Sequence, residues 1–129
     1  MEATLEAPYT NVLLLLREVD LMKKWVPLIM EVKIMNEYTT WRQLMYQKFD
    51  SPWPMKDRED IVEVTCYMVP GEDALVFSFE SASTPEWFGT KITRDKKNTV
   101  EMLFNKSFGY IKPLGPNKTH FKFIINADP

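Results

Sequence analysis

Few side chains in this 129-residue chain have the type and spacing of a catalytic or metal-binding site. His120 is the single histidine, has no metal ligand or nucleophile at a recognised spacing, and is expected on the solvated face of its strand. Cys66, the single cysteine, falls on the apolar side of its predicted strand, where burial raises the pKa of a thiol and suppresses its reactivity. Both residues favour structural roles over chemistry.

The densest group of charges is the run 57–60, Asp-Arg-Glu-Asp. Paired carboxylates can act as general acid and base, but adjacent residues at the junction of a loop and a strand point in different directions. The chain also has no glycine-rich phosphate-binding loop. The sequence therefore predicts no enzyme activity, no cofactor and no metal site.

Composition narrows the class of protein further. Sixteen basic and eighteen acidic residues give a net charge of -2, which argues against a nucleic-acid partner. The lone cysteine cannot pair within the chain, the acidic start at 1–3 differs from a basic secretory signal, and the apolar run 12–16 is too short to cross a bilayer. We expect a cytoplasmic protein that forms one domain over residues 1–129.

The loop before the charged run holds Trp53 between two prolines. Pro52 and Pro54 fix their own φ angles and restrict the residues before them, so the indole is presented in one place. We interpret Trp53 and Met55 as a gate or plug beside an apolar strand. The alternative is an Ω-type loop whose tryptophan only roofs the local core.

The elements that carry these residues follow from periodicity. Thr10 and Asn11 are candidate caps of a helix whose apolar residues recur at three-to-four spacing as far as Trp25, and Pro27 ends it. Alternating apolar residues between turn signals predict strands at 30–38, 41–49, 61–69, 74–81, 100–112 and 118–128. Residues 83–97 are expected to be a long connection with a solvated basic end. The predicted fold class is α+β, a helical segment followed by one antiparallel sheet of about six strands.

One face of this sheet is broadly apolar, because side chains two residues apart share a side of the pleat. The predicted apolar wall consists of Met45, Val62, Val64, Cys66, Leu75, Phe77, Met102, Phe104, Phe121 and Phe123. The opposite positions, such as Glu63, are mixed, and we expect that face to be wet. A single short helix cannot cover so much apolar surface, which predicts that another segment, a partner or a ligand does so.

Four segments, taken in order, resemble the START (StAR-related lipid transfer) family. These are 18–27 with its acidic-apolar-Lys-Trp-Pro pattern, the Pro-Trp-Pro segment 52–59 that resembles the family's loop before its Arg-Asp step, the glycine-aromatic-x-x-Pro-Leu strand end at 107–114, and the closing strand 118–128. The resemblance implies a helix-grip fold, a curved antiparallel sheet wrapped around a lipid tunnel. It implies that the apolar wall lines the tunnel and that Trp53 and Met55 lie at its mouth.

The sequence departs from the family pattern in three respects. Only ten residues precede the first matching segment, where the family has a helix and three strands, and the chain ends at Pro129, where the family continues into a lid helix. We therefore expect an incomplete domain core. Two positions where many members carry a charged or polar tunnel residue also differ. Val64 stands where a strand arginine is expected, and Glu101 replaces the arginine at the start of the strand that follows residue 99.

Two functional hypotheses follow. In the first, the cavity binds or transfers a lipid, a sterol or a phospholipid or acyl chain, with transient membrane contact. In the second, the chain is a degenerate scaffold whose apolar face docks a protein partner or a second copy, completing bare sheet edges at 30–38 and 118–127. A charge at Val64 or Phe104 is expected to abolish lipid capture, while a change at Glu63 should be silent.

Overall fold

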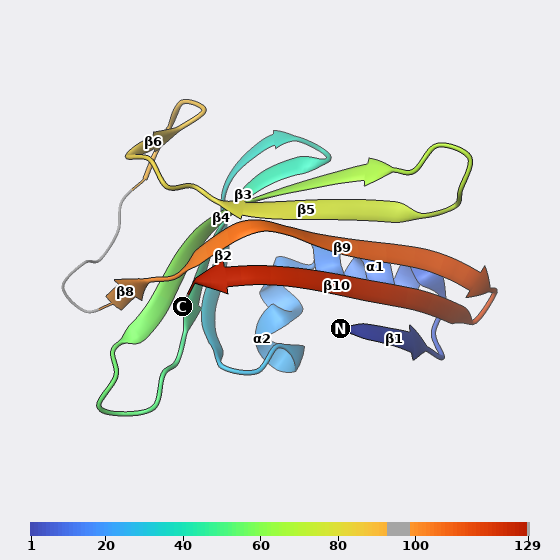
Figure 1. Cartoon of the computed structure of the whole chain (residues 1–129), viewed down its shortest axis with the longest axis horizontal. Coiled ribbons are helices and arrows are strands. Elements are labelled where there is room, and N and C mark those ends of the chain that lie inside the picture. Colours follow the sequence, from blue (N-terminus) through green and yellow to red (C-terminus); the bar gives the residue numbers. More distant parts are fainter. Residues whose placement is uncertain (93–98, 129) are drawn as a thin grey trace.

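The computed structural model describes residues 1–92 and 99–128, apart from the side chains of Trp25 and Asp128, and is built around one long antiparallel sheet (Figure 1). Its strand order is β1-β10-β9-β5-β4-β3-β2, with β8 added beside β4 and a separate β6–β7 hairpin. The strands are β1 (Glu2–Leu5), β2 (Ile29–Thr39), β3 (Arg42–Phe49), β4 (Asp57–Met68), β5 (Leu75–Ser81), β6 (Glu86–Trp87), β7 (Thr90–Lys91), β8 (Thr99–Glu101), β9 (Leu103–Gly115) and β10 (Lys118–Asp128). The expected α+β class and its antiparallel sheet are confirmed.

The predicted helix is broken into three short pieces. They are α1 (Tyr9–Arg17), the 3-10 helix η1 (Val19–Leu21) and α2 (Met22–Trp25). The first piece starts earlier than expected, directly after Pro8, whose φ of -59° suits a helix start, so Thr10 and Asn11 lie inside the helix and do not cap it. Glu18 interrupts the helix because its ψ of 80° leaves the helical region.

Strand β1 was not predicted, and it changes one edge of the sheet. Its four residues pair antiparallel with β10, from Glu2 opposite Lys122 to Leu5 opposite Thr119. Glu2 also holds His120, with 3.0 Å between its Oε1 and the histidine Nε2. The expectation that the whole segment 118–127 is a bare edge is therefore wrong for its first half, whereas β2 does form the other edge of the sheet.

The single strand expected at 100–112 is in fact two strands. Strand β8 pairs parallel with the start of β4, with Asp57 opposite Thr99, and β9 then runs between β5 and β10. The same pairing explains why β4 begins at Asp57 and not at Ile61, since β3 on one side and β8 on the other satisfy its polar first residues. The charged run thus lies within a strand, and its side chains alternate between faces.

The inner face, defined as the face of the sheet that packs against α1, η1 and α2, holds two buried clusters. One contains Val12, Leu75, Phe77 and Ile111, and the other contains Val19, Val32, Met45 and Val62. Close packing requires glycine at position 109, because a Cβ there would lie 2.1 Å from the Phe77 ring. The inner face is therefore tightly packed at its centre.

The outer face, on the opposite side of the same sheet, is less wet than predicted. Leu44, Ile61 and Ala82 form a third buried cluster, and Trp87 and Ile92 pack against it. The last two belong to the segment expected to be a plain connection, which instead folds the β6–β7 hairpin over this face. Lys91 is exposed as predicted, and the rest of the basic segment, 93–97, lies outside the described residues.

Candidate functional site

The inner face gathers most of the predicted cavity wall into continuous rows across the sheet. Cys66, Phe77, Gly109 and Phe123 lie opposite one another on four adjacent strands. A parallel row, listed by strand, contains Met68, Leu75, Ile111 and Phe121. Further along the same face, Met45 lies opposite Val62, and Val64 opposite Phe79. The alternation in the sequence thus predicted which side chains share this surface.

The predicted wall residues differ in burial. Met45, Val62, Leu75 and Phe77 are buried, whereas the others are half-buried and present part of their surface; these are Val64, Cys66, Met102, Phe104, Phe121 and Phe123. Met102 is the least integrated of them: it lies at the β8–β9 junction, where its amide donates to the Glu59 carbonyl at 2.9 Å. Half-buried aromatic rings on an inner face are surface available to a ligand.

Five aromatic side chains of the inner face, four of them predicted wall residues, form a row that we call the phenylalanine row. Its successive ring centroids, from Phe104 to Phe79, Phe77, Phe123 and Phe121, are 5.6, 6.4, 5.3 and 4.6 Å apart. Three of the four contacts are edge-to-face, the geometry that aromatic quadrupoles favour. Alternation with Leu75 and Phe77 places Phe79 on the apolar side of its strand, but Phe79 was not among the predicted wall residues.

A bulge in β9 brings Phe104 into this row. The pairing of β9 with β10 shifts by one residue between Phe108 opposite Ile124 and Asn105 opposite Asn126. Ser107 fills the irregularity, since its Oγ accepts from the Asn126 amide and donates to the Asn105 carbonyl, both at 2.9 Å. Phe104 therefore reaches Phe79 on the inner face, while Phe108, an even number of residues away, lies on the outer face.

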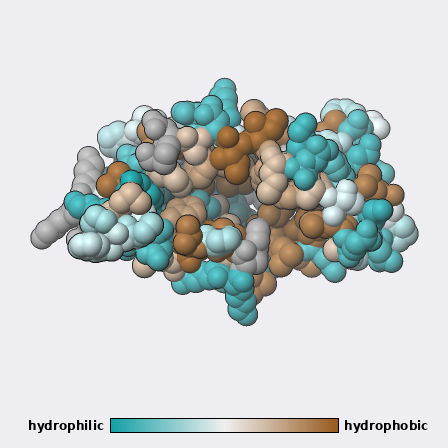
Figure 2. Space-filling view, turned by 60° about the horizontal axis from the view of Figure 1, so that its bottom comes forward, coloured by the Kyte–Doolittle hydropathy of each residue, from teal (hydrophilic) through white to brown (hydrophobic). Residues whose placement is uncertain are grey.

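The helices cover the inner face only in part. Val12, Leu13 and Leu16 of α1 pack on it, whereas Leu14 and Leu15 point away and are exposed. Together with Asn11, Glu18 and Leu21, these two leucines line a shallow apolar hollow of about 330 Å³. Hydrophobic side chains also gather around a hollow along the middle of the face shown in Figure 2. The helical layer thus carries apolar surface of its own toward solvent.

Buried polar groups join the strands at one end of the inner face. Ser81 Oγ donates to Asp60 Oδ1 at 2.6 Å and accepts from the Phe104 amide at 2.8 Å. One hydroxyl therefore links β4, β5 and β9 where their ladder ends. Sequence reasoning missed Ser81, since an isolated serine in a strand carries no signal of its partners.

The thiol of Cys66 lies within the inner face and packs against its first cluster. Burial raises its pKa, and the nearby positive charge of Arg17 offsets this only in part. The same cluster includes the side chain of Tyr9, whose pKa is raised by burial and by the charges of Asp73 and Cys66. A neutral thiol fits the predicted role of Cys66 as a small hydrophobic residue.

Glu63 on the outer face belongs to a charged network. Its carboxylate accepts two hydrogen bonds from Arg42, at 2.9 and 3.0 Å, and a third from Trp87 Nε1. Burial acts to raise the pKa of Glu63, but the hydrogen bonds from Arg42 and Trp87 outweigh it and hold that pKa below its ordinary value. Glu63 is therefore not the plain surface position that was expected, because its loss leaves the donors of Arg42 and Trp87 without their acceptor. The expectation that a change at Glu63 is silent in lipid capture stays a prediction.

The network also fixes the β6–β7 hairpin. The Arg42 guanidinium lies 5.1 Å from the ring centroid of Tyr38 and 4.2 Å from that of Phe88, and the Tyr38 hydroxyl donates to the Trp87 carbonyl at 2.8 Å. These contacts combine cation–π attraction with hydrogen bonding. They explain why a short hairpin stays on the outer face.

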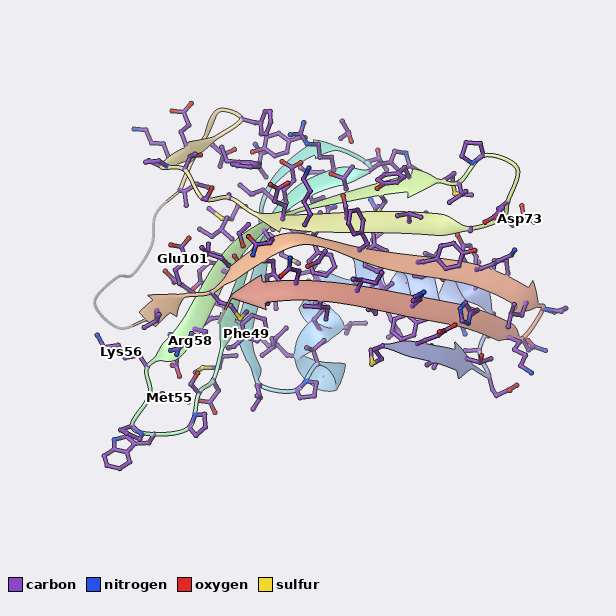
Figure 3. All side chains as sticks on the ribbon, viewed as in Figure 1. Phe49, Met55, Lys56, Arg58, Asp73 and Glu101 are labelled. Carbon is purple, nitrogen blue, oxygen red and sulfur yellow. The ribbon has the colours of Figure 1, made fainter. Side chains whose placement is uncertain are left out.

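The predicted gate loop, residues 50–56, projects beyond the sheet, with Met55 and Lys56 on it (Figure 3). Trp53 at its tip is 92% exposed, so the alternative that it roofs the local core is wrong. The loop is tied at its base, where the Asp50 amide donates to the Leu28 carbonyl at 2.8 Å. Leu28 is itself 65% exposed, which places a second apolar side chain on a neighbouring loop.

Solved structures of lipid-transfer domains superpose on this whole architecture. Human STARD10 matches with a TM-score of 0.83 at 17% identity, over 99% of this chain and 50% of that one. The chain has the helix-grip fold of a START domain. Human StAR-related lipid transfer protein 5 has the same START fold, with a TM-score of 0.81 at 16% identity over 98% of this chain and 59% of that one. A STAR-related lipid transfer protein fragment from Xanthomonas axonopodis gives 0.76 at 19% identity, over 99% and 67%.

The similarity to these START structures confirms the resemblance at the level of the fold. The chain spans about half to two thirds of the length of the solved structures that it matches. No protein-family model matches the sequence, and no curated protein sequence does either. Within the described residues, no helix has the length and hydropathy needed to cross a bilayer.

Proposed function

We propose that this chain binds a lipid on its inner face and transfers it without catalysis. The observation that carries the proposal is the phenylalanine row, a run of half-buried and buried rings on the inner face of a START fold. An apolar surface of this kind gains about 0.8 kcal/mol for each methylene of a ligand that it removes from water. The ligand is therefore a sterol or an acyl chain, selected by shape and area.

The proposed binding wall consists of the predicted residues, to which we add Phe79. Val64 packs against both clusters of the inner face and lies between them, so a charge there would face the ligand. In this proposal the chain acts as a carrier in the cytoplasm and uses no cofactor. Its partners are the lipid and, transiently, a membrane.

The loop at 50–56 would make the membrane contact. Trp53 and Met55 are exposed, and Leu28 stands beside the base of the loop. A tryptophan ring is favoured at the level of the lipid headgroups, because it is apolar with one polar edge. Contact with a bilayer through this loop would bring the inner face close to the membrane, from which the ligand enters.

A second candidate function is that of a scaffold whose apolar surface docks a protein partner or a second copy of the chain. It is favoured by the apolar hollow at Leu14, Leu15 and Leu21, which faces away from the sheet, and by the outer edge of β2, which pairs with no strand among the described residues. Exposed apolar surface of this kind marks protein interfaces as readily as ligand sites.

Native mass spectrometry of the purified chain, followed by solvent extraction, separates the two functions. A monomer that carries extractable lipid supports the carrier. A lipid-free dimer, or a chain that stays soluble only with a bound protein, supports the scaffold and contradicts lipid transfer. The same spectrum reports mass and oligomeric state, so a single sample decides between them.

A further inference from the structure

Strand β2 forms a long open edge of the sheet. It pairs with β3 on one side and with no strand among the described residues on the other. The backbone groups of such an edge can hydrogen-bond to a further strand, from another chain or the same one. Arg17 of α1 occupies the end of β2, where it donates to the Thr40 carbonyl at 3.1 Å and lies 3.7 Å from Glu37. The first half of β2 is therefore the part to which another strand can add.

Two irregularities limit where a partner strand can pair with this edge. The pairing of β2 with β3 shifts between Ile29 and Glu31 and again between Ile34 and Asn36. Shifts of this kind bend a strand and disrupt its ladder. The stretch 31–34 lies between them and keeps an unbroken register with β3. We expect a partner strand to pair with residues 31–34.

The outer face of this stretch ends a row of alternating charges. Glu59 of β4 lies opposite Lys48 of β3, and Lys48 lies opposite Glu31 of β2. Opposite charges on directly paired residues attract, so the next position in the row, beyond the edge, favours a cation. Lys33 of the same strand interacts with Glu31 only weakly, since its Nζ lies 4.0 Å from Glu31 Oε1 and both side chains are half-exposed.

A second copy of the chain can supply that cation from its own β2. When two identical edges pair antiparallel about a two-fold axis, the residue on the axis faces itself and the residues on either side of it face each other. Val32 and Lys33 are the two residues with neighbours on both sides inside the regular stretch. An axis at Val32 places Glu31 of each copy opposite Lys33 of the other, whereas an axis at Lys33 places two ammonium groups face to face. An axis between two residues would pair side chains from opposite faces of the sheet, so the charges select Val32.

The same register brings exposed apolar side chains together. Counting outward from Val32, Met30 of one copy lies opposite Ile34 of the other. These side chains are 44% and 42% exposed in the single chain, and contact between them would remove apolar surface from water. Pairing at an edge extends a sheet and does not stack on it, so both inner faces stay uncovered.

We propose that β2 pairs antiparallel with β2 of a second copy of this chain, about a two-fold axis at Val32. Two ion pairs between Glu31 and Lys33 cross the edge, and contacts between Met30 and Ile34 flank them. The inference goes beyond the proposed lipid binding and does not depend on it, because the ligand surface of each copy remains accessible.

Sedimentation velocity over a concentration series tests this dimer with two single variants, Glu31→Lys and Lys33→Glu. Each variant places like charges opposite each other twice, so we expect its dimer to be about tenfold weaker than that of the wild type. An equimolar mixture of the two variants should restore the dimer, because a copy with two carboxylates then pairs with a copy with two ammonium groups. Restoration by mixing also shows that both variants are folded.

The matched controls are Glu6→Lys and Lys118→Glu. They make the same charge changes in another exposed ion pair, which joins atoms 3.8 Å apart beside β1 at the opposite edge of the sheet. Both controls should dimerise as the wild type does. A wild type that stays monomeric, single variants that dimerise normally, a mixture no stronger than its components, or an equal loss in the controls would each overturn the pairing.

Lipid extracted from the same samples keeps this test separate from the proposed function. A wild-type monomer that carries lipid overturns the pairing and leaves lipid binding standing. A lipid-free dimer that the charge variants weaken and their mixture restores supports the pairing and contradicts lipid transfer. A dimer that carries lipid, and keeps it when Lys33→Glu weakens the dimer, supports both.

Discussion

The two faces of one sheet bury their apolar residues in different ways. On the outer face, Leu44 and Ile61 are closed off by a hairpin from the same chain, which Arg42, Glu63 and Trp87 hold in place. On the inner face, the helices pack on the centre but leave the rings at the ends half-buried. The contacts of the closed outer face stabilise the fold, whereas the partly open inner face has surface that a ligand can contact.

The largest effect should separate two phenylalanines on one strand. Phe104→Asp places a charge in the phenylalanine row, and we expect lipid binding at least about tenfold weaker, because an aspartate there must be desolvated when the ligand enters. Phe108→Asp is the matched control on the outer face and should keep its lipid. Extraction and quantification of bound lipid decides the point, and an equal loss in both variants would break the assignment of faces.

The next effect concerns packing at the centre of the inner face. Gly109→Ala inserts a methyl group into the Phe77 ring and should lower the free energy of unfolding by about 3 kcal/mol. Gly115→Ala, where no atom lies within 4 Å of the added carbon, should be nearly neutral. Urea unfolding compares the two, and similar midpoints would mean that Phe77 can move aside at little cost.

A substitution on the outer face should act on stability without touching the ligand. Glu63→Gln removes the charge that accepts from Arg42 and Trp87, and we expect a loss of about 2 kcal/mol in the free energy of unfolding. Glu37→Gln, which breaks a half-exposed ion pair with Arg17 at 3.7 Å, should cost much less. Lipid binding that falls together with stability in Glu63→Gln would show that the two faces are coupled.

The same carboxylate predicts a pH dependence. The pKa of Glu63 is lower in the folded chain than its ordinary value of 4.5, so its contribution to stability is present above pH 4.5 and is lost as the pH falls through the folded pKa. The stability difference between the wild type and Glu63→Gln should therefore shrink below pH 4.5. Urea titrations between pH 7 and pH 3 measure it, and a constant difference would contradict the assigned shift.

The smallest effect belongs to the projecting loop. Trp53→Ala should slow lipid transfer between vesicles about threefold to tenfold, corresponding to about 1 kcal/mol of lost aromatic contact, with unfolding unchanged because the ring is exposed. Trp41→Ala removes another exposed tryptophan and serves as the control. Equal transfer by all three proteins would remove the loop from the transfer step.

The sequence predicted the inner face better than the outer one, for physical reasons. Alternation in β4, β5 and β10 places Val64, Phe77 and Phe123 correctly, because a half-buried strand imposes a period of two. Strand β1 was missed because its alternation covers only two apolar residues, Ala3 and Leu5, which is too little to predict a strand without its partner β10. Trp87 and Ile92 depend on tertiary contacts that no local pattern records.

The predicted gate loop also shows what a local sequence pattern can and cannot predict. Two prolines around Trp53 correctly indicated a presented side chain, since proline restricts the backbone locally. The tie between Asp50 and Leu28, which brings a second apolar loop beside it, joins residues far apart in the chain and had no local signal. Ser81 and Glu63 were not predicted for the same reason, because their hydrogen-bond partners also lie far away in the chain.

The bulge at Ser107 has an evolutionary consequence. Side chains along a strand alternate between the two faces of the sheet. The extra residue of the bulge reverses this alternation for every position from the bulge back to the start of β9. A substitution at Ser107 that let β9 and β10 pair without the bulge would therefore turn Phe104 outward and bring Leu103 and Asn105 inward, without altering any other side chain. A lineage could thus exchange an aromatic lining for a polar one in one step, faster than by successive point substitutions.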